Sequence, residues 1–121
     1  VKHFLRFFPP DKLEPGDVLI TNDIWLGTGH LPDVTLAKPI FRDGKLVAFS
    51  ATTAHVPDIG GKIRSPEPRE VFEEGLQIPP MKMMAAGKTD ETLVALIRKN
   101  VRTPDQTMGD LYAQIVALDL M

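Results

Sequence analysis

The sequence predicts an α+β fold in which an antiparallel β-hairpin precedes two C-terminal helices. Two apolar, β-branched runs, residues 34–41 and 46–53, are separated by a short segment with Asp-Gly at its centre, which indicates a hairpin. After residue 88 the apolar residues recur at helical spacing. A chain of 121 residues with 43% hydrophobic content can bury one modest core, so we expect one compact unit or part of a larger one.

Four segments are expected along the chain. Residues 1–16 form a leading segment, 17–61 hold the strands and the hairpin, 62–87 are rich in loops, and 88–121 are helical. Proline and charged residues crowd the third segment, which makes a long irregular connection the natural expectation there.

A first strand is expected at residues 17–21, directly after the leading segment. The loop that follows begins at Asn22-Asp23 and contains Trp25. This tryptophan either lines a pocket or lies in the core, and the core is the favoured prediction because a large aromatic side chain gains much from burial.

The hairpin turn nearly fixes how its two strands pair. An Asp-Gly pair between Arg42 and Lys45 supplies the positive φ angles of a type I′ turn. If Arg42 faces Lys45, the same register places Asp33 opposite Ala54. Pro39 has no amide donor and therefore indicates an edge strand or a bulge, and a bulge would shift this register by one residue.

Pairing of these strands brings together His30, Asp33 and His55, because directly opposed β-carbons in a sheet are only about 5 Å apart. Two imidazoles and one carboxylate suit Zn²⁺, Mn²⁺ or Fe²⁺, and three protein ligands leave positions open for water or substrate. The alternative is that the histidines are ordinary hydrogen-bonded residues near strand ends, since His-x-x-Asp alone often occurs by chance.

Two helices are predicted in the last third of the chain. Thr89 is expected to cap the first, which ends near Asn100, and a capping box that starts at Thr103, with Pro104 at the first helical position, opens the second. The two helices carry more apolar side chains than so small a unit can readily bury, so we expect some of them to be exposed to solvent. These residues are Leu93, Leu96, Ile97, Leu111, Ile115 and Val116.

Composition and motifs argue against several function classes. The net charge of −2 with mixed signs gives no basic stripe, so no nucleic-acid partner is expected. No apolar run is long enough to span a bilayer, so no membrane partner is expected either. The absence of cysteine rules out disulfides and is compatible with the cytoplasm, the localisation we expect. Glycine-rich phosphate-binding motifs are missing, so ATP is not expected to bind to this chain.

Five motifs, in order along the chain, resemble the hydantoinase B/oxoprolinase family. They are Pro-Gly-Asp and Thr-Asn-Asp at 15–17 and 21–23, Leu-Gly-Thr-Gly-His-Leu-Pro-Asp at 26–33, Ala-His and Asp-Ile-Gly-Gly at 54–55 and 58–61, Glu-Glu-Gly-Leu-Gln-Ile-Pro-Pro at 73–80, and Asn-Val-Arg-Thr-Pro at 100–104. Members include the B subunit of ATP-dependent N-methylhydantoinase, the C-terminal half of 5-oxoprolinase and large subunits of acetone and acetophenone carboxylases. Because family subunits are several times longer, the chain looks like an internal fragment.

The resemblance implies a reaction divided between two subunits. A hydantoinase A-type partner binds ATP and phosphorylates a carbonyl or enol oxygen, and the B-type subunit then hydrolyses a cyclic amide or, in the carboxylase branch, carboxylates a ketone-derived substrate. In that branch manganese is held by residues that match His30, Asp33 and His55 here. Asp58 and Asp23 are candidates for orienting the ligands or acting as a general base.

The leading hypothesis is therefore a B-type subunit of an ATP-dependent cyclic amide hydrolase, inactive as this isolated chain. A ketone carboxylase subunit is the rival within the family. A structural or subunit-interaction module, in which the histidines merely close the hairpin, is the rival from another class. One departure from the family pattern is Ile24-Trp25, where many members carry a proline and an aromatic residue, and it concerns the shape of the loop rather than the ligands.

Overall fold

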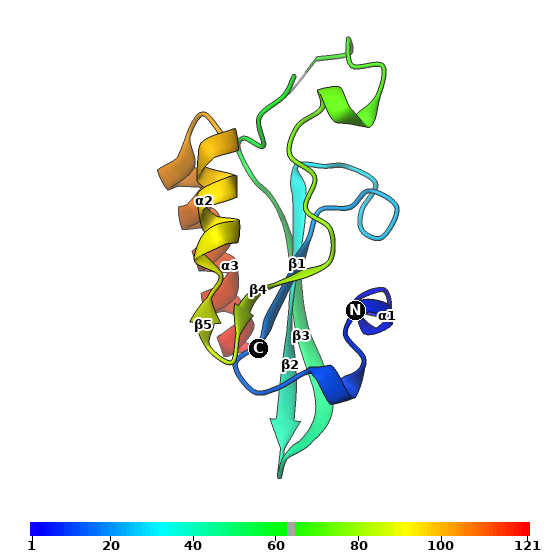
Figure 1. Cartoon of the computed structure of the whole chain (residues 1–121), viewed down its shortest axis with the longest axis vertical. Coiled ribbons are helices and arrows are strands. Elements are labelled where there is room, and N and C mark those ends of the chain that lie inside the picture. Colours follow the sequence, from blue (N-terminus) through cyan, green and yellow to red (C-terminus); the bar gives the residue numbers. More distant parts are fainter. Residues whose placement is uncertain (63–64) are drawn as a thin grey trace.

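A computed structural model describes residues 1–62 and 65–121, and in this part of the chain an antiparallel five-stranded sheet separates helices on its two sides (Figure 1). The strand order is β3-β2-β1-β4-β5. The strands are β1 (Val18–Thr21), β2 (Asp33–Arg42), β3 (Lys45–His55), β4 (Met81–Ala85) and β5 (Lys88–Thr89). The helices are α1 (Phe4–Phe7), α2 (Glu91–Asn100) and α3 (Pro104–Leu120), with 3₁₀ turns η1 (Pro10–Lys12) and η2 (Val71–Glu73). The predicted α+β class, with a hairpin followed by two helices, is confirmed.

Two apolar clusters lie on opposite faces of the sheet, and β1 is buried from both sides. Figure 1 shows α2 and α3 on one side of the strands and α1 on the other. Alternation of side chains along β1 explains the division, because Ile20 faces the helices whereas Leu19 packs with the N-terminal segment. The larger cluster includes Val18, Ile20, Leu36, Leu93, Ile97, Met108 and Leu111, and the smaller one includes Phe4, Leu13, Leu19 and Ala37.

The hairpin turn forms as predicted, but one extra residue shifts the pairing beyond it. Asp43 and Gly44 have φ angles of 51° and 74°, as a type I′ turn requires. Phe41 pairs with Leu46, whereas Ile40 pairs with Ala48, so that Val47 is the additional residue of a β-bulge.

At the far end of the hairpin the register is therefore the one shifted by a bulge, which Pro39 left open as an alternative, and not the unshifted one. Asp33 lies opposite His55, not opposite Ala54. Pro39 is tolerated within β2 because β1 pairs only with Thr35–Ala37, which leaves the proline with a strand neighbour on one side only.

The segment expected to be rich in loops contributes two short pieces of regular structure. β4 pairs with both β1 and β5, and η2 is a single 3₁₀ turn. Residues 63 and 64 of this segment lie outside the described residues.

The prediction that Thr89 caps α2 is wrong by one residue. Thr89 belongs to β5, and the cap is Asp90, whose Oδ1 accepts hydrogen bonds of 3.0 Å from the backbone N–H groups of Thr92 and Leu93. A carboxylate satisfies two free donors and also carries the negative charge favoured at a helix N-terminus, so it outcompetes the neighbouring hydroxyl.

Helix α3 begins at Pro104 as predicted, but the capping box does not form. The Thr103 side chain makes no capping hydrogen bond, and only its carbonyl accepts from the backbone of Thr107. Proline supplies the preset φ of the first helical position, so the helix can begin there without a side-chain cap. None of the helices in the described residues is long and apolar enough to cross a membrane.

Trp25 is 84% exposed, so the prediction that it lies in the core is wrong. Asp23 explains this placement, because its Oδ1 accepts a 2.8 Å hydrogen bond from the Trp25 backbone and its carbonyl accepts from Gly27. A local polar turn of this kind holds the loop at the surface and overrides the preference of the indole for burial.

Of the six apolar residues considered, Leu96 on α2 is 53% exposed and Val116 on α3 is 59% exposed, and α3 exposes further apolar residues. Tyr112, Val116 and Leu120 are 44%, 59% and 84% exposed, and their spacing of four residues places them on one stripe of the helix. Leu93, Ile97 and Leu111 are buried, so only some of the six apolar residues considered are exposed to solvent.

We predict that this stripe binds a hydrophobic dye or promotes self-association of the isolated chain, because such a surface favours removal from water. Dye fluorescence should fall in a Tyr112→Gln, Val116→Gln double variant and stay unchanged in Val47→Gln, a matched change at the exposed bulge. A monomeric wild-type chain that binds no dye and unfolds cooperatively would contradict the prediction.

Candidate metal centre

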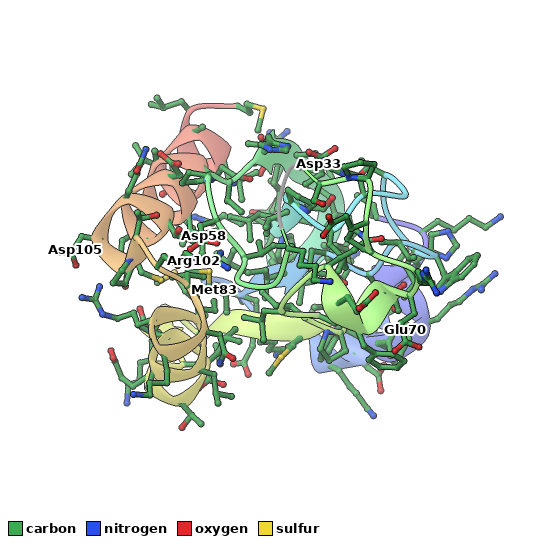
Figure 2. All side chains as sticks on the ribbon, turned by 90° about the horizontal axis from the view of Figure 1, so that it is seen from above. Asp33, Asp58, Glu70, Met83, Arg102 and Asp105 are labelled. Carbon is green, nitrogen blue, oxygen red and sulfur yellow. The ribbon has the colours of Figure 1, made fainter. Side chains whose placement is uncertain are left out.

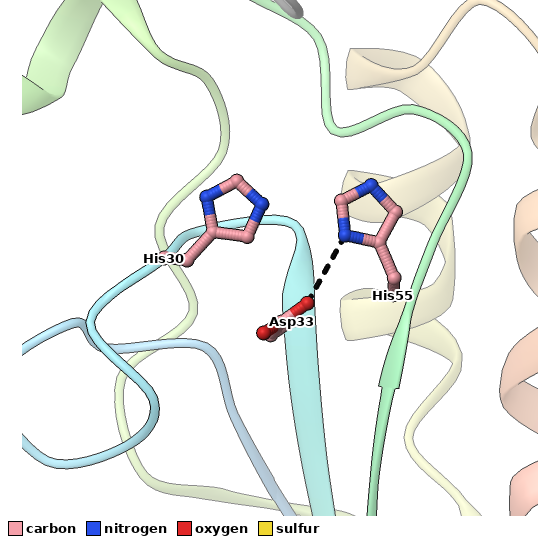
Figure 3. A group of neighbouring side chains, drawn as sticks. All are labelled: His30, Asp33 and His55. Atoms are coloured by element: carbon pink, nitrogen blue, oxygen red, sulfur yellow. Dashed lines mark hydrogen bonds and ion pairs between the residues drawn. The ribbon is translucent and has the colours of Figure 1, made fainter.

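His30, Asp33 and His55 converge at the open end of the β2–β3 hairpin (Figure 3). One ligand atom from each residue can be chosen so that all three atoms lie within 4.8 Å of one another. His55 Nδ1 lies 3.0 Å from Asp33 Oδ1, and the two imidazole rings stack with centroids 5.2 Å apart. The predicted grouping of these three side chains is therefore present in the structure.

Backbone pairing and a tight turn produce this arrangement. Asp33 and His55 are direct cross-strand partners, so their side chains lie on the same face of the sheet. His30 is placed beside them because the Asp33 N–H donates to the His30 carbonyl at 3.1 Å and closes a turn. Leu31, within that turn, is completely buried and anchors it to the core.

Asn22 attaches the histidine loop to a distant part of the chain. Its side-chain Nδ2 donates to the carbonyls of Leu31 and Leu76, both at 2.9 Å, and its Oδ1 accepts from Ile78 N at 2.6 Å. Asn22 is only 2% exposed, so these bonds satisfy a buried amide. From the sequence, Asn22 was identified only as the start of a loop. Its position directly after an apolar strand was the one available sign that its side chain could be buried.

The three side chains fit a divalent ion. Ligand atoms about 2.1 Å from an ion and roughly at right angles are about 3 Å apart, which matches the 3.0 Å separation of Asp33 Oδ1 and His55 Nδ1. The same contact also serves as a hydrogen bond when a proton occupies it. Both histidines are exposed and Asp33 is half-buried, so the site is open on one side to water or substrate.

A pocket of about 680 Å³ lies against both histidines. This volume is in the range of small-molecule sites. Its walls come from the hairpin ends and from two later segments, and they combine four prolines with a few polar groups. The lining residues are His30, Pro32, His55, Val56, Pro57, Lys62, Ser65, Pro66, Pro68 and Glu74.

Asp58 is buried and bonded to the junction between α2 and α3. Its carboxylate accepts hydrogen bonds from the backbone and the guanidinium of Arg102 and from Gly60 N. Figure 2 shows Asp58 beside Arg102, with Asp33 farther away. The residue therefore clamps the loop that leads from β3 to the pocket wall, a role that sequence reasoning missed.

The clamp explains the Asp-Ile-Gly-Gly sequence and the ionisation of its aspartate. Gly60 has a φ of +79°, and a β-carbon there would overlap the Asn100 carbonyl. Burial raises the pKa of the Asp58 carboxyl, but hydrogen bonds from Arg102 N and Gly60 N, with the positive charge of Arg102, outweigh it. The net pKa lies below its ordinary value, so Asp58 is ionised at neutral pH.

Asp23 lies in the loop before His30. Its Oδ1 is occupied by the backbone N–H of Trp25. Neither Asp23 nor Asp58 has a hydrogen bond to the three candidate ligands among the described contacts, and their proposed roles in orienting ligands or moving protons stay predictions.

The sequence matches the profile of the Hydantoinase B/oxoprolinase family over residues 1–121. The chain belongs to this family. The Asn22 attachment, the histidine turn and the Asp58 clamp described above all involve residues of the five motifs that resemble this family.

Three relatives illustrate the range of the family. The chain is 42% identical to an uncharacterised protein of Methanocaldococcus jannaschii, with 90% of this chain and 20% of that protein covered. It is 36% identical to caprolactamase subunit beta of Pseudomonas jessenii, with 86% and 18% covered. It is 30% identical to the acetophenone carboxylase delta subunit of Aromatoleum aromaticum, with 98% and 18% covered.

The fold agrees with a solved relative. The crystal structure of ATP-dependent caprolactamase from Pseudomonas jessenii superposes with a TM-score of 0.90 at 35% identity, with 98% of this chain and 21% of that one covered. The chain thus spans about a fifth of the length of each of the three relatives named above.

We predict that Asp58→Asn lowers the free energy of unfolding by about 2 kcal/mol at neutral pH, because hydrogen bonds to a charged group are lost. Since folding lowers the pKa of Asp58, its contribution is complete above the ordinary aspartate range and disappears as pH falls through the folded value. Urea unfolding at several pH values should show the gap between the variant and wild type closing in acid.

Asp43→Asn, on the exposed hairpin turn, is the matched control and should unfold like wild type at every pH. A control is needed because Asp17 also contributes to the pH dependence of stability. Burial raises the pKa of Asp17, but Lys82 and backbone donors outweigh the burial and lower it. This contribution is common to all the variants, so the difference between them reports on Asp58 alone. A gap between Asp58→Asn and wild type that does not depend on pH would contradict the prediction.

Proposed function

We propose that this chain forms the metal-holding part of a B-type subunit in an ATP-dependent enzyme that hydrolyses the C–N bond of a cyclic amide. The observation that carries the proposal is the convergence of His30, Asp33 and His55 beside a pocket of about 680 Å³. Membership of the Hydantoinase B/oxoprolinase family supports it, as does the 36% identity to caprolactamase subunit beta, which is named for a cyclic amide. A hydantoinase A-type partner would bind ATP and activate the substrate.

The ligand set defines what each side chain does. An ion held there, Mn²⁺ or Zn²⁺, would supply a Lewis acid to activate water or a carbonyl group. Asp33 contributes the one negative charge of the set, and the imidazoles bind through their neutral form. Pro32, Pro57 and the other pocket prolines form rigid apolar walls that can hold a ring and limit the access of water.

We predict that His55→Ala lowers the affinity for Mn²⁺ or Zn²⁺ at least tenfold in calorimetric titration, because it removes one of three ligands. His3→Ala, on the N-terminal segment, is the control and should bind like wild type. Affinity should also fall in acid, since a protonated imidazole cannot be a ligand. Equal affinity in both variants would refute the assignment.

A ketone carboxylase subunit is the second candidate function, supported by the 30% identity to the acetophenone carboxylase delta subunit. The two reactions are separated by the co-substrate, because turnover of the complete enzyme would require bicarbonate only in the carboxylase. A subunit-interaction module without chemistry is favoured instead if the purified chain holds no metal and a chelator leaves its stability unchanged.

We predict that this chain alone hydrolyses neither ATP nor a hydantoin. It lacks a phosphate-binding loop, and opening an unactivated amide would forgo the phosphorylation assigned to the partner. Activity should require the parent subunit, an A-type partner, ATP and a divalent ion together, measured as amide cleavage coupled to ATP consumption. ATP hydrolysis by the chain alone, abolished in His30→Ala, would place the nucleotide chemistry on these residues.

A further inference from the structure

The two outer edges of the described sheet differ in how well they are guarded against further pairing. At one edge, β5 has only two residues and carries Lys88, and short length and lysine both discourage an added strand. At the other edge, β3 runs from Lys45 to His55 and is the longest strand of the described residues. The nine residues between these two ends include neither a charged residue nor a proline. The edge of β3 is therefore open to another strand.

The pairing of β3 with β2 determines which of its backbone groups point outward. The Val56 N–H donates to the Pro32 carbonyl at 2.9 Å, one step beyond the Asp33–His55 pair. Hydrogen-bonded and non-bonded pairs alternate along an antiparallel ladder, so His55 belongs to a non-bonded pair, and its N–H and C=O point away from β2. By the same alternation, back to the bulge, the outward residues of β3 are Phe49, Ala51, Thr53 and His55.

Pro39 is consistent with this assignment. It lies opposite Phe49, and in a non-bonded pair neither residue needs an N–H directed at the other strand. Among the described residues, no hydrogen bond is found to the backbone N–H or C=O of the four outward residues. Three of the four are exposed and Phe49 is half-buried, so a row of strong donors and acceptors lies at the surface without a protein partner.

We propose that this edge of β3 pairs with one further β-strand, which the parent subunit supplies from outside these 121 residues. The chain covers only about a fifth of each of the three relatives named above, so most of such a subunit is available to provide the strand. A strand on the same polypeptide has a high effective concentration at the edge. A second copy of β3 would instead lose the full entropy of association for a contact of only four outward residues. Because β3 is uncharged along this stretch, the added strand is expected to be uncharged as well.

The added strand lies beside the candidate metal centre. His55 is both an outward residue of the edge and one of the three candidate ligands. Neighbouring strands are about 4.8 Å apart, and directly opposed side chains share a face of the sheet. The residue opposite His55 on the added strand is therefore on the same face as Asp33 and flanks the His55 side chain. This consequence rests on the proposed metal site, whereas the pairing itself does not.

Backbone hydrogen exchange, resolved to single residues, tests the pairing in the 121-residue chain and in the parent subunit, both in chelator. The N–H groups of Ala51 and Thr53 should exchange freely in the dilute chain and about a hundredfold more slowly in the parent subunit. The N–H groups of Ser50 and Thr52 point to β2, so they are the control and should be protected in both proteins.

A proline variant separates strand pairing from simple cover. Ala51→Pro removes one outward N–H, so the Thr53 amide of the parent subunit should exchange about tenfold faster than in wild type. In the 121-residue chain the same change should have little effect on stability, because this N–H has no partner there. Ala51→Ser keeps the N–H and is the matched control, which should exchange like wild type in both proteins.

Outward amides that stay unprotected in the parent subunit would overturn the proposal. Protection in the 121-residue chain that grows with protein concentration would overturn it in favour of a second copy of β3. Equal protection of Thr53 in the wild-type and Ala51→Pro parent subunits would overturn it in favour of a loop or helix that covers the edge without pairing. Because chelator is present throughout, failure of the proposed metal site would leave all these results unchanged.

Discussion

The pairing of Asp33 with His55 is the interaction on which the candidate site depends. Side chains in a strand alternate between faces, so a register shifted by one residue would send one of these two side chains to the opposite face of the sheet. The extra residue that sets the register is Val47, near the turn and far along the strands from the ligands. The single extra residue of the bulge therefore determines whether the Asp33 carboxylate and the His55 imidazole lie on the same face, although it lies far from both.

A second requirement is that distant segments be joined to the hairpin end. Asn22 fastens the histidine turn to the segment before β4, and Asp58 with Arg102 fastens the loop after β3 to the helices. Both are buried polar groups with their hydrogen bonds satisfied, which makes each attachment specific in geometry as well as favourable. Each is also costly to break, because a buried amide or carboxylate would lose hydrogen bonds away from water.

Local chemistry explains which features could be predicted from the sequence. The Asp-Gly turn, the apolar run of β1 and the proline that opens α3 are encoded within a few residues, and all three were predicted. The bulge was predicted only as an alternative, and the favoured prediction for Trp25 was burial, because each outcome results from a competition. Strand pairing competes with turn geometry in the first case, and a local polar turn competes with burial in the second. The proximity of the three ligands at one end of the hairpin was predicted, whereas the common face of Asp33 and His55 depends on the bulge.

The two sides of the pocket differ in how freely they can change. Backbone pairing positions Asp33 and His55, so substitutions elsewhere can alter their distance only by disturbing the sheet. The opposite wall, with Lys62 and Ser65, lies on a proline-rich connection whose side chains can be exchanged while its backbone attachment to Glu73 is kept. Such a division keeps the candidate metal ligands fixed by the sheet and leaves the facing wall of the pocket free to change its side chains.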